Sequence, residues 1–181
     1  AFERSEAWRI TADKGRLPWS QEWVPYAQIS DHLKRAVIAS EDDGFSNHDG
    51  VDWGALEKAW AKNAKAEDRA AQRAAQSAAA NAKNARPPKV VGGSTITQQL
   101  AKNLFLSGER TLVRKGQEFV LTMLLEAFLS KQRILEIYLN SVEWGEGLFG
   151  AQAAARHYFR VDAARLGNVE AARLGLAHLL L

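Results

Sequence analysis

Apolar residues recur three and four positions apart along most of this chain, and strict alternation of apolar with polar residues is nearly absent. The first spacing is that of one face of an α-helix, whereas alternation is typical of a half-buried strand. Ile96, Leu100 and Leu104 show the helical spacing within one short stretch. We therefore expect a mainly α-helical domain with little or no β-structure.

Several of the expected helices carry their own start signal. Asp31 is the predicted N-cap of a helix that begins there, Thr95-x-x-Gln98 fits a capping box, and Ser130 precedes another helical stretch. Further helices are predicted from about 52, over 111–129, over 151–159 and over 168–181. The glycine- and aromatic-rich stretch 141–150 is predicted as a loop.

The predicted organisation is an irregular N-terminal arm over 1–30 and a single domain over 31–181, with an alanine-rich insertion at 61–89. The insertion contains no apolar residue larger than alanine. Alanine favours a helix, but there is no apolar stripe to bury. We expect an exposed helix or connector that ends at Pro87-Pro88.

Composition limits the function classes. The 181 residues carry a net charge of +3 at a pI near 9.3, which suits an anionic partner without selecting one. Cysteine is absent, so disulfides and thiolate metal sites are excluded. The longest apolar run, 119–129, is interrupted by Glu126 and is shorter than the roughly 20 residues that span a bilayer.

Glu41 is the first candidate catalytic residue, because it ends an apolar helix beside the turn that holds Asp42, Asp43 and His48. A carboxyl at such a rim can accept or donate a proton. The alternative is that the acids are solvated and His48 only pins the turn. No metal site is predicted, because His48 and the acids lack a recognised ligand spacing.

The stretch GGSTITQQLAKN (92–103) carries more polar groups than a capped helix needs. Residues three and four apart share a helix face, so the following polar side chains can face one ligand: Ser94, Gln98, Gln99, Lys102 and Asn103. Arg110 adds a cation, and the helix N-terminus favours an anion or a sugar. An ordinary capped helix with a polar face is the alternative.

Glu118 follows Arg114 by four residues and Lys115 by three, a spacing that predicts local ion pairs. Such pairs contribute about 0.3–0.5 kcal/mol when exposed. The functional interpretation makes Glu118 a second acid that cationic neighbours keep ionised.

Four motifs occur in order: EDDGFSNHDG (41–50), GGSTITQQLAKN (92–103), RKGQE (114–118) and KQRILEIYLN (131–140). Together they resemble those of the bacterial peptidoglycan glycosyltransferases, which comprise monofunctional transglycosylases and the N-terminal domain of bifunctional penicillin-binding proteins. The resemblance covers about residues 31–160. One departure is Arg160, where glycine is common in that family.

The resemblance implies a lysozyme-like, two-lobed helical fold with a cleft, and polymerisation of lipid II into β-1,4-linked glycan with undecaprenyl pyrophosphate as leaving group. It implies Glu41 as base and Glu118 on the donor side. Lys102 and Arg110 would bind pyrophosphate, and Ser94, Gln98, Gln99 and Asn103 would line the cleft. Support of the site is assigned in the same way to Asp42, Phe45, His48 and Arg114.

The resemblance also implies partners and a location. Expected partners are lipid II, the growing lipid-linked glycan strand, the cytoplasmic membrane and other cell-wall synthases, with no nucleic acid. The catalytic domain would face the outer or periplasmic side, with an N-terminal anchor outside these residues. No cofactor is expected to be obligatory, with Mg²⁺ or Mn²⁺ a candidate at the donor pyrophosphate. Phe105 and Leu106 are candidates for contact with the bilayer or for core packing.

Two alternatives stay open at this stage. A lysozyme-like hydrolase or lytic enzyme would use Glu41 as general acid, but it needs no cationic site for pyrophosphate. A non-enzymatic helical module could bind nucleic acid through its basic alanine-rich segment. That segment lacks the interleaved aromatic residues that stack on bases.

Overall fold

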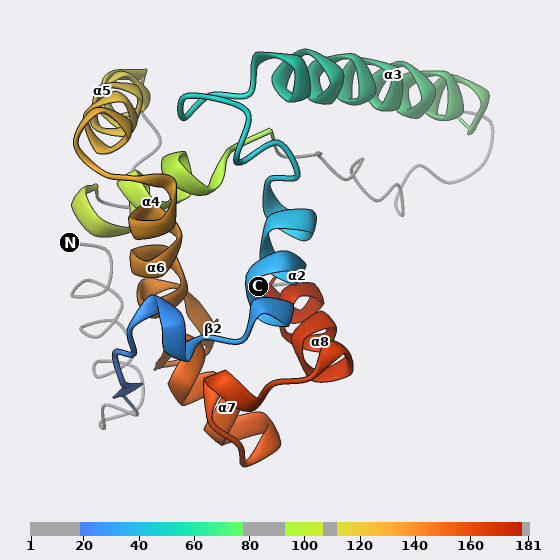
Figure 1. The fold of residues 1–181 in the computed structure, drawn as a ribbon. Helices are drawn as coiled ribbons and strands as arrows, with labels where there is room; N and C mark the ends of the chain where they lie inside the picture. The colour runs from blue at the N-terminus through green and yellow to red at the C-terminus, as the bar shows by residue number, and fades with distance from the viewer. Residues whose placement is uncertain (1–18, 78–92, 107–111, 179–181) are drawn as a thin grey trace. The chain divides into compact units, whose positions relative to one another are not determined.

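The computed structural model describes residues 19–77, 93–106 and 112–178. The chain divides into two compact units. Unit 1 comprises 1–51 and 95–181, and unit 2 comprises 52–94. The helices of unit 1 are α2 (Asp31–Glu41), α4 (Ile96–Phe105), α5 (Leu112–Phe128), α6 (Lys131–Ser141), α7 (Ala151–Phe159) and α8 (Asn168–His178), with short 3₁₀ helices η1 (Tyr26–Gln28) and η3 (Ala163–Arg165) (Figure 1).

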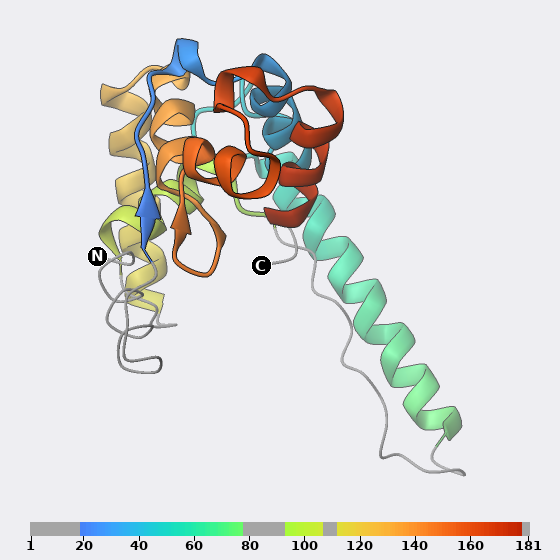
Figure 2. The ribbon, with the colours of Figure 1, turned by 90° about the horizontal axis from the view of Figure 1, so that it is seen from below.

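The expectation of a mainly α-helical, lysozyme-like domain is confirmed by these elements. Within unit 1, α2 packs against α8, and α4 packs against both α5 and α6 (Figure 1, Figure 2). Leu33 and Val37 of α2, Leu100 of α4, and Tyr138 and Leu139 of α6 belong to one buried cluster. The apolar stripes seen in the sequence thus meet in a single core.

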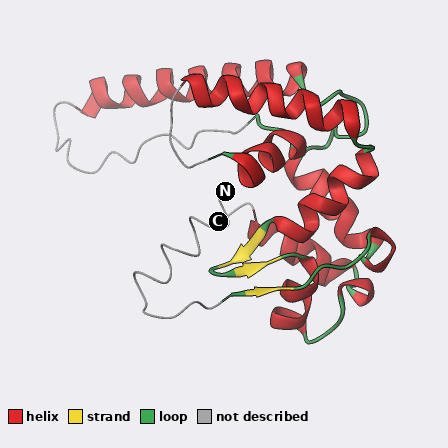
Figure 3. Cartoon of the chain, turned by 90° about the vertical axis from the view of Figure 1, so that its left-hand side faces the viewer, coloured by secondary structure: helices red, strands yellow, loops and turns green. Residues whose placement is uncertain are grey.

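A small sheet replaces the loop that was predicted over 141–150. Glu143–Gly145 (β2) and Leu148–Phe149 (β3) form an antiparallel hairpin, and Ser20–Gln21 (β1) pairs with β3 in parallel (Figure 3). Gly147 lies in the turn with φ +72°, a conformation that glycine adopts without strain. The loop prediction was wrong because the third strand comes from the N-terminal arm, more than 120 residues earlier.

The predicted N-caps are confirmed at two helices and wrong at one. Thr95 and Gln98 form a capping box, and the Ser130 side chain accepts from a backbone N–H of α6. In α2, however, the cap is Ser30 and not Asp31, because the Ser30 side chain accepts from His32 N. Ser30 Oγ also donates to the carbonyl of Leu166 at 2.6 Å, a contact that the local sequence does not reveal.

Unit 2 contains one long helix, α3 (Trp53–Ser77), which begins at the predicted place. The Asp52 carboxylate accepts from Ala55 N at 2.7 Å at its start. Its described side chains between 61 and 69 are exposed, except for a half-buried Ala66. The first part of the alanine-rich segment is therefore an exposed helix, as predicted, and its remainder over 78–89 lies outside the described residues.

Candidate active site

Glu41 is the last residue of α2, and its two carboxylate oxygens have different surroundings. Oε2 accepts a hydrogen bond from Gln99 Nε2 at 2.9 Å. Oε1 is buried and has no hydrogen-bond partner within the described parts of the chain. An unpaired buried oxygen is costly, and the C-terminal end of a helix disfavours a negative charge by a further 0.3–1 kcal/mol or so. A catalytic role is one of the explanations for an uncompensated buried group of this kind.

Gln99 connects Glu41 to the core through a second hydrogen bond. The hydroxyl of Tyr138 donates to Gln99 Oε1 at 3.0 Å. Tyr138 is fully buried, and burial raises its pKa well above the ordinary value of 10, with smaller contributions from the charges of Glu41 and Asp42. Three helices, α2, α4 and α6, therefore meet in one chain of hydrogen bonds.

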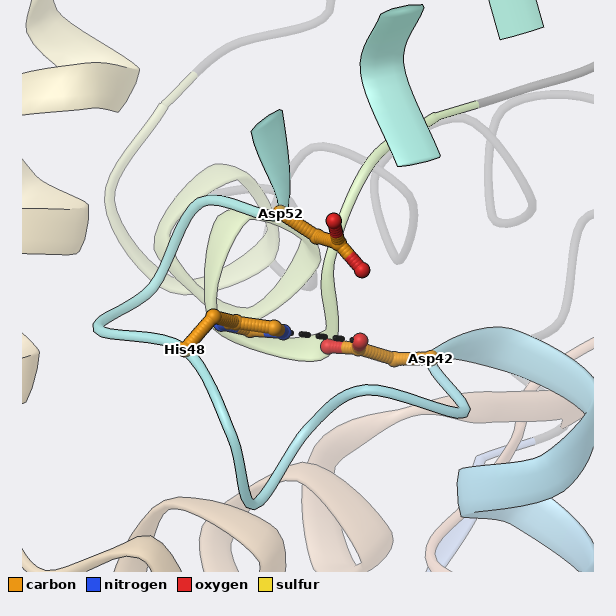
Figure 4. Close-up of side chains that lie close together, drawn as sticks. All are labelled: Asp42, His48 and Asp52. Atoms are coloured by element: carbon orange, nitrogen blue, oxygen red, sulfur yellow. Dashed lines mark hydrogen bonds and ion pairs between the residues drawn. The ribbon is translucent and has the colours of Figure 1, made fainter. Parts of the chain in front are cut away.

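Asp42 and His48 hold the turn that follows α2. His48 Nε2 lies 2.8 Å from Asp42 Oδ1 (Figure 4). His48 Nδ1 accepts from Gly50 N at 3.1 Å, so the proton of the neutral ring is on Nε2 and is donated to Asp42. Asp42 Oδ2 accepts from Ile96 N at 3.0 Å, which ties the turn to the first residue of α4. These contacts support the predicted role of Asp42 and His48 in holding the turn.

Gly50 ends this turn in a conformation that requires glycine, with φ +87°. A Cβ there would lie 2.7 Å from Thr122 Cγ2 and 2.8 Å from Glu126 Cγ of α5. Its carbonyl accepts from Thr95 Oγ1 at 2.6 Å. The turn therefore packs against α5 about one helical turn beyond Glu118, the second predicted acid. The backbone carbonyl of Glu118 accepts a hydrogen bond from Thr122 Oγ1.

Phe45 anchors the middle of the same turn. It is buried, and Lys131 Nζ lies 4.6 Å from the centroid of its ring. Lys131 also pairs with Glu126 at 2.8 Å, and Thr97 Oγ1 donates to Glu126 at 2.6 Å. Residues of the first, second and fourth motifs therefore share one network, which supports the predicted structural role of Phe45.

The polar residues of the second motif divide by burial. Gln98 is buried, and its side-chain carbonyl accepts a hydrogen bond from Thr95 N at 3.0 Å. Gln98 therefore takes part in the N-terminal cap of α4. Lys102 is exposed and Asn103 half-buried, and both lie about one turn after Gln99 on its side of α4. Ser94 is exposed and ends unit 2.

Glu118 is buried and carries both predicted ion pairs. Its Oε2 lies 3.3 Å from Arg114 Nη1, and its Oε1 contacts Lys115 Nζ. Both oxygens are therefore engaged by cations. The predicted role of Glu118 toward substrate stays a prediction.

Arg110 lies outside the described residues, so the predicted pairing of Lys102 with Arg110 stays a prediction. The structure brings Gln99 to Glu41 and His48 to Asp42. Lys102 lies on α4, the helix that also carries Gln99. Tyr138 was missed as a site residue, although it lies within the fourth motif. Within the segments that the structure describes, Glu41 Oε1 lacks a hydrogen-bond partner and lies beside the helix that carries Lys102, an arrangement suited to proton removal near an anionic group.

Comparison with known proteins identifies the family of the chain. A family model described as Transglycosylase matches residues 12–178. Proteins named biosynthetic peptidoglycan transglycosylase, from Janthinobacterium sp. (strain Marseille) and Burkholderia ambifaria (strain MC40-6), are 55% and 50% identical over 176 residues. These alignments cover 97% of this chain and 68% and 64% of the relatives.

A protein of the same name from Herminiimonas arsenicoxydans is 54% identical over 155 residues, which are 86% of this chain and 58% of the relative. The chain thus spans about two thirds of the length of the curated relatives it matches. The resemblance to the peptidoglycan glycosyltransferases, first drawn from four motifs, is confirmed.

Proposed function

Because this chain belongs to the transglycosylase family, we propose that it polymerises lipid II into β-1,4-linked glycan strands. The growing lipid-linked strand is the donor, and the 4-hydroxyl of the incoming lipid II is the acceptor. The observation that carries the proposal is the buried Oε1 of Glu41, which has no hydrogen-bond partner among the described residues and lies beside the helix that bears Lys102.

The chemistry is a single displacement with inversion. The donor sugar is α-linked to pyrophosphate and the product is β-linked, so the acceptor oxygen attacks C1 from the face opposite the leaving group. The C1–O bond to undecaprenyl pyrophosphate breaks, and its electron pair leaves on the pyrophosphate. Glu41 Oε1 takes the proton of the acceptor hydroxyl, and general base catalysis of this kind contributes about 10²–10⁴-fold.

The leaving group needs positive charge and not a general acid. Lys102 and Arg110 supply that charge in the proposal, since fixed cations stabilise charge that develops in the transition state. Glu118, with Arg114 and Lys115, orients the donor sugar-pyrophosphate. Gln98, Gln99, Asn103 and Ser94 line the substrate path.

No cofactor is obligatory in this mechanism. A Mg²⁺ or Mn²⁺ ion would serve as a further counter-ion of the pyrophosphate. Glu118 does not fit as its ligand in the conformation described, because both oxygens are already engaged by Arg114 and Lys115. No step is therefore routed through a metal.

A lipid-linked substrate places the enzyme at the bacterial cytoplasmic membrane, with the catalytic domain on the outer or periplasmic face and with other cell-wall synthases as partners. Support comes from exposed apolar side chains on α5, namely Val113, Phe119, Val120, Leu124 and Phe128. Phe105 is 51% exposed and fits contact with lipid, whereas Leu106 is 8% exposed and belongs to the core. Across the described segments, no helix has the length and apolarity to cross a membrane.

Glu41→Gln tests the proposal, because it keeps the size of the side chain and removes the base. We expect polymerisation of labelled lipid II, followed by gel analysis of glycan products, to fall by about two to four orders of magnitude. Binding of lipid II should stay within about twofold, since the change acts on the transition state. Undiminished turnover would remove Glu41 from the mechanism, and release of soluble muropeptides from cell-wall glycan would indicate a hydrolase.

A further inference from the structure

The hydrogen-bond chain from Tyr138 through Gln99 to Glu41 has a direction. A glutamine amide has one end that only accepts and one end that only donates. Gln99 Oε1 faces the Tyr138 hydroxyl at 3.0 Å, and Gln99 Nε2 faces Glu41 Oε2 at 2.9 Å. The amide orientation is thus set by its two partners.

The Glu41 carboxylate requires Nε2 of this amide because it only accepts, and the Tyr138 hydroxyl holds the Oε1 end in place by donating to it. A reversed amide would turn Gln99 Oε1 toward the Glu41 carboxylate, so that two acceptors would face each other. Burial and the charges of Glu41 and Asp42 raise the pKa of Tyr138 well above its ordinary value, so the hydroxyl keeps its proton at neutral pH. A protonated phenol can donate to the Gln99 carbonyl at every turnover.

The neighbouring charged groups do not compete for Gln99. Asp42 Oδ1 receives the His48 proton, and Asp42 Oδ2 accepts from Ile96 N. Both oxygens of Asp42 therefore have donors other than Gln99. Gln99 is left to bridge Glu41 and Tyr138.

We propose that Tyr138 is a positioning residue for the base: through Gln99 it holds Glu41 Oε2 as a fixed acceptor, so that Oε1 receives the proton of the acceptor sugar. The inference rests on the proposed role of Glu41. It adds that the two oxygens of the Glu41 carboxylate have different roles. Glu41 Oε2 keeps the carboxylate in place, and Oε1, which is buried without a partner among the described residues, does the chemistry.

The hydroxyl, and not the ring, carries this role. The ring of Tyr138 lies in the core, where phenylalanine would fill nearly the same volume. Tyr138→Phe therefore removes one donor and leaves the packing in place. Gln99 Oε1 then loses the donor that anchors it, so the side chain can move away from Glu41, and the carboxylate loses its fixed partner in a fraction of the molecules.

A double-mutant cycle on Tyr138 and Gln99 tests the inference. Tyr138→Phe should lower kcat for lipid II polymerisation about tenfold, as expected for loss of a hydrogen bond in a charged network, with KM within about twofold. Gln99→Met removes the amide and should lower kcat at least as far. Because no amide is left to orient, Tyr138→Phe in the Gln99→Met background should change kcat by less than about twofold.

The outcomes separate a positioning role from a purely structural one. If the two single effects multiply in the double variant, Tyr138 acts on the fold independently of Gln99 and the inference is overturned. Tyr158→Phe is the matched control, because its hydroxyl donates to the Trp144 carbonyl and its ring is about half exposed. It should leave kcat unchanged.

Comparison with Glu41→Gln separates the positioning role of Tyr138 from the role of Glu41 as the base. If Glu41→Gln is inactive while Tyr138→Phe has wild-type kcat, the positioning role fails and the proposed function stands. If Glu41→Gln retains full turnover, the proposed base fails, and with it the role assigned to Tyr138.

Discussion

Helices α3 and α4 are both rich in polar residues, and they differ in what those residues contact. In α4, Thr97 donates to Glu126 of α5, Gln99 contacts both α2 and α6, and Thr95 at the cap donates to the Gly50 carbonyl. In α3, the described side chains between 61 and 69 are mostly exposed. Helix α4 is specified by long-range contacts, and helix α3 by the intrinsic helix preference of alanine.

A high content of polar residues in a helix therefore does not by itself locate a functional site. Both segments contain amide and cationic side chains at helical spacing. Among the described side chains of the two helices, buried polar groups with partners from distant parts of the chain occur in α4, and such groups are positioned with low freedom. A site that must hold a carboxylate in place needs a helix of the α4 kind, with buried polar groups that have distant partners.

The largest expected effect comes from breaking the anchor of α4. Asp42→Ala removes the acceptor of both His48 Nε2–H and Ile96 N–H. Hydrogen bonds to a charged group contribute about 1.5–3 kcal/mol each, so we expect a loss of about 3 kcal/mol in the free energy of unfolding. Thermal unfolding should show a Tm lower by about 6–12 °C.

The neighbouring Asp43 provides the control, since it is exposed. Asp43→Ala should change the free energy of unfolding by less than about 0.5 kcal/mol. Equal losses from the two variants would mean that α4 does not depend on the Asp42 contact.

An alanine-to-glycine substitution in each of the two helices tests how far the stability of each depends on packing. Ala101 of α4 is fully buried, and Ala64 of α3 is exposed. Ala101→Gly should destabilise α4 by about 2 kcal/mol, from lost helix preference and a lost buried methyl group. Ala64→Gly should cost about 1 kcal/mol, from helix preference alone.

Hydrogen exchange followed by mass spectrometry on peptides from each helix measures both effects. Exchange in α4 should accelerate more in Ala101→Gly than exchange in α3 does in Ala64→Gly. The reverse order would show that α3 has packing contacts that its exposure does not reveal.

The smallest effect concerns Arg160, the position where the resemblance led us to expect glycine. Arg160 ends α7 with φ +61°, and it is the single non-glycine residue with positive φ in the described part of the chain. This conformation costs a non-glycine residue about 1 kcal/mol, partly offset by the greater freedom of glycine in the unfolded chain. Arg160→Gly should therefore stabilise the protein by about 0.5 kcal/mol and raise Tm by about 1–2 °C.

Arg165 is an exposed arginine without positive φ and serves as the matched control. Arg165→Gly should lower Tm, because glycine there gains no relief of strain. If both variants lower Tm equally, the left-handed conformation of Arg160 carries no measurable strain.

Sequence patterns were enough to predict the helical class, the capping box at Thr95 and Gln98, the cap at Ser130 and the family. These depend on residues within a few positions of one another, or on motifs whose order is preserved along the chain. The Glu118 ion pairs were predictable for the same reason, because three- and four-residue spacing places the groups on one helix face.

The tertiary structure sets which oxygen of Glu41 lacks a hydrogen-bond partner among the described residues. That depends on Gln99, 58 residues later, and on Tyr138, a further 39 residues on. It also decided that Ser30 caps α2, through a bond to Leu166, and that Ser20–Gln21 completes the sheet. Such contacts join residues that no local spacing relates, so they follow from how the core packs and not from helix periodicity.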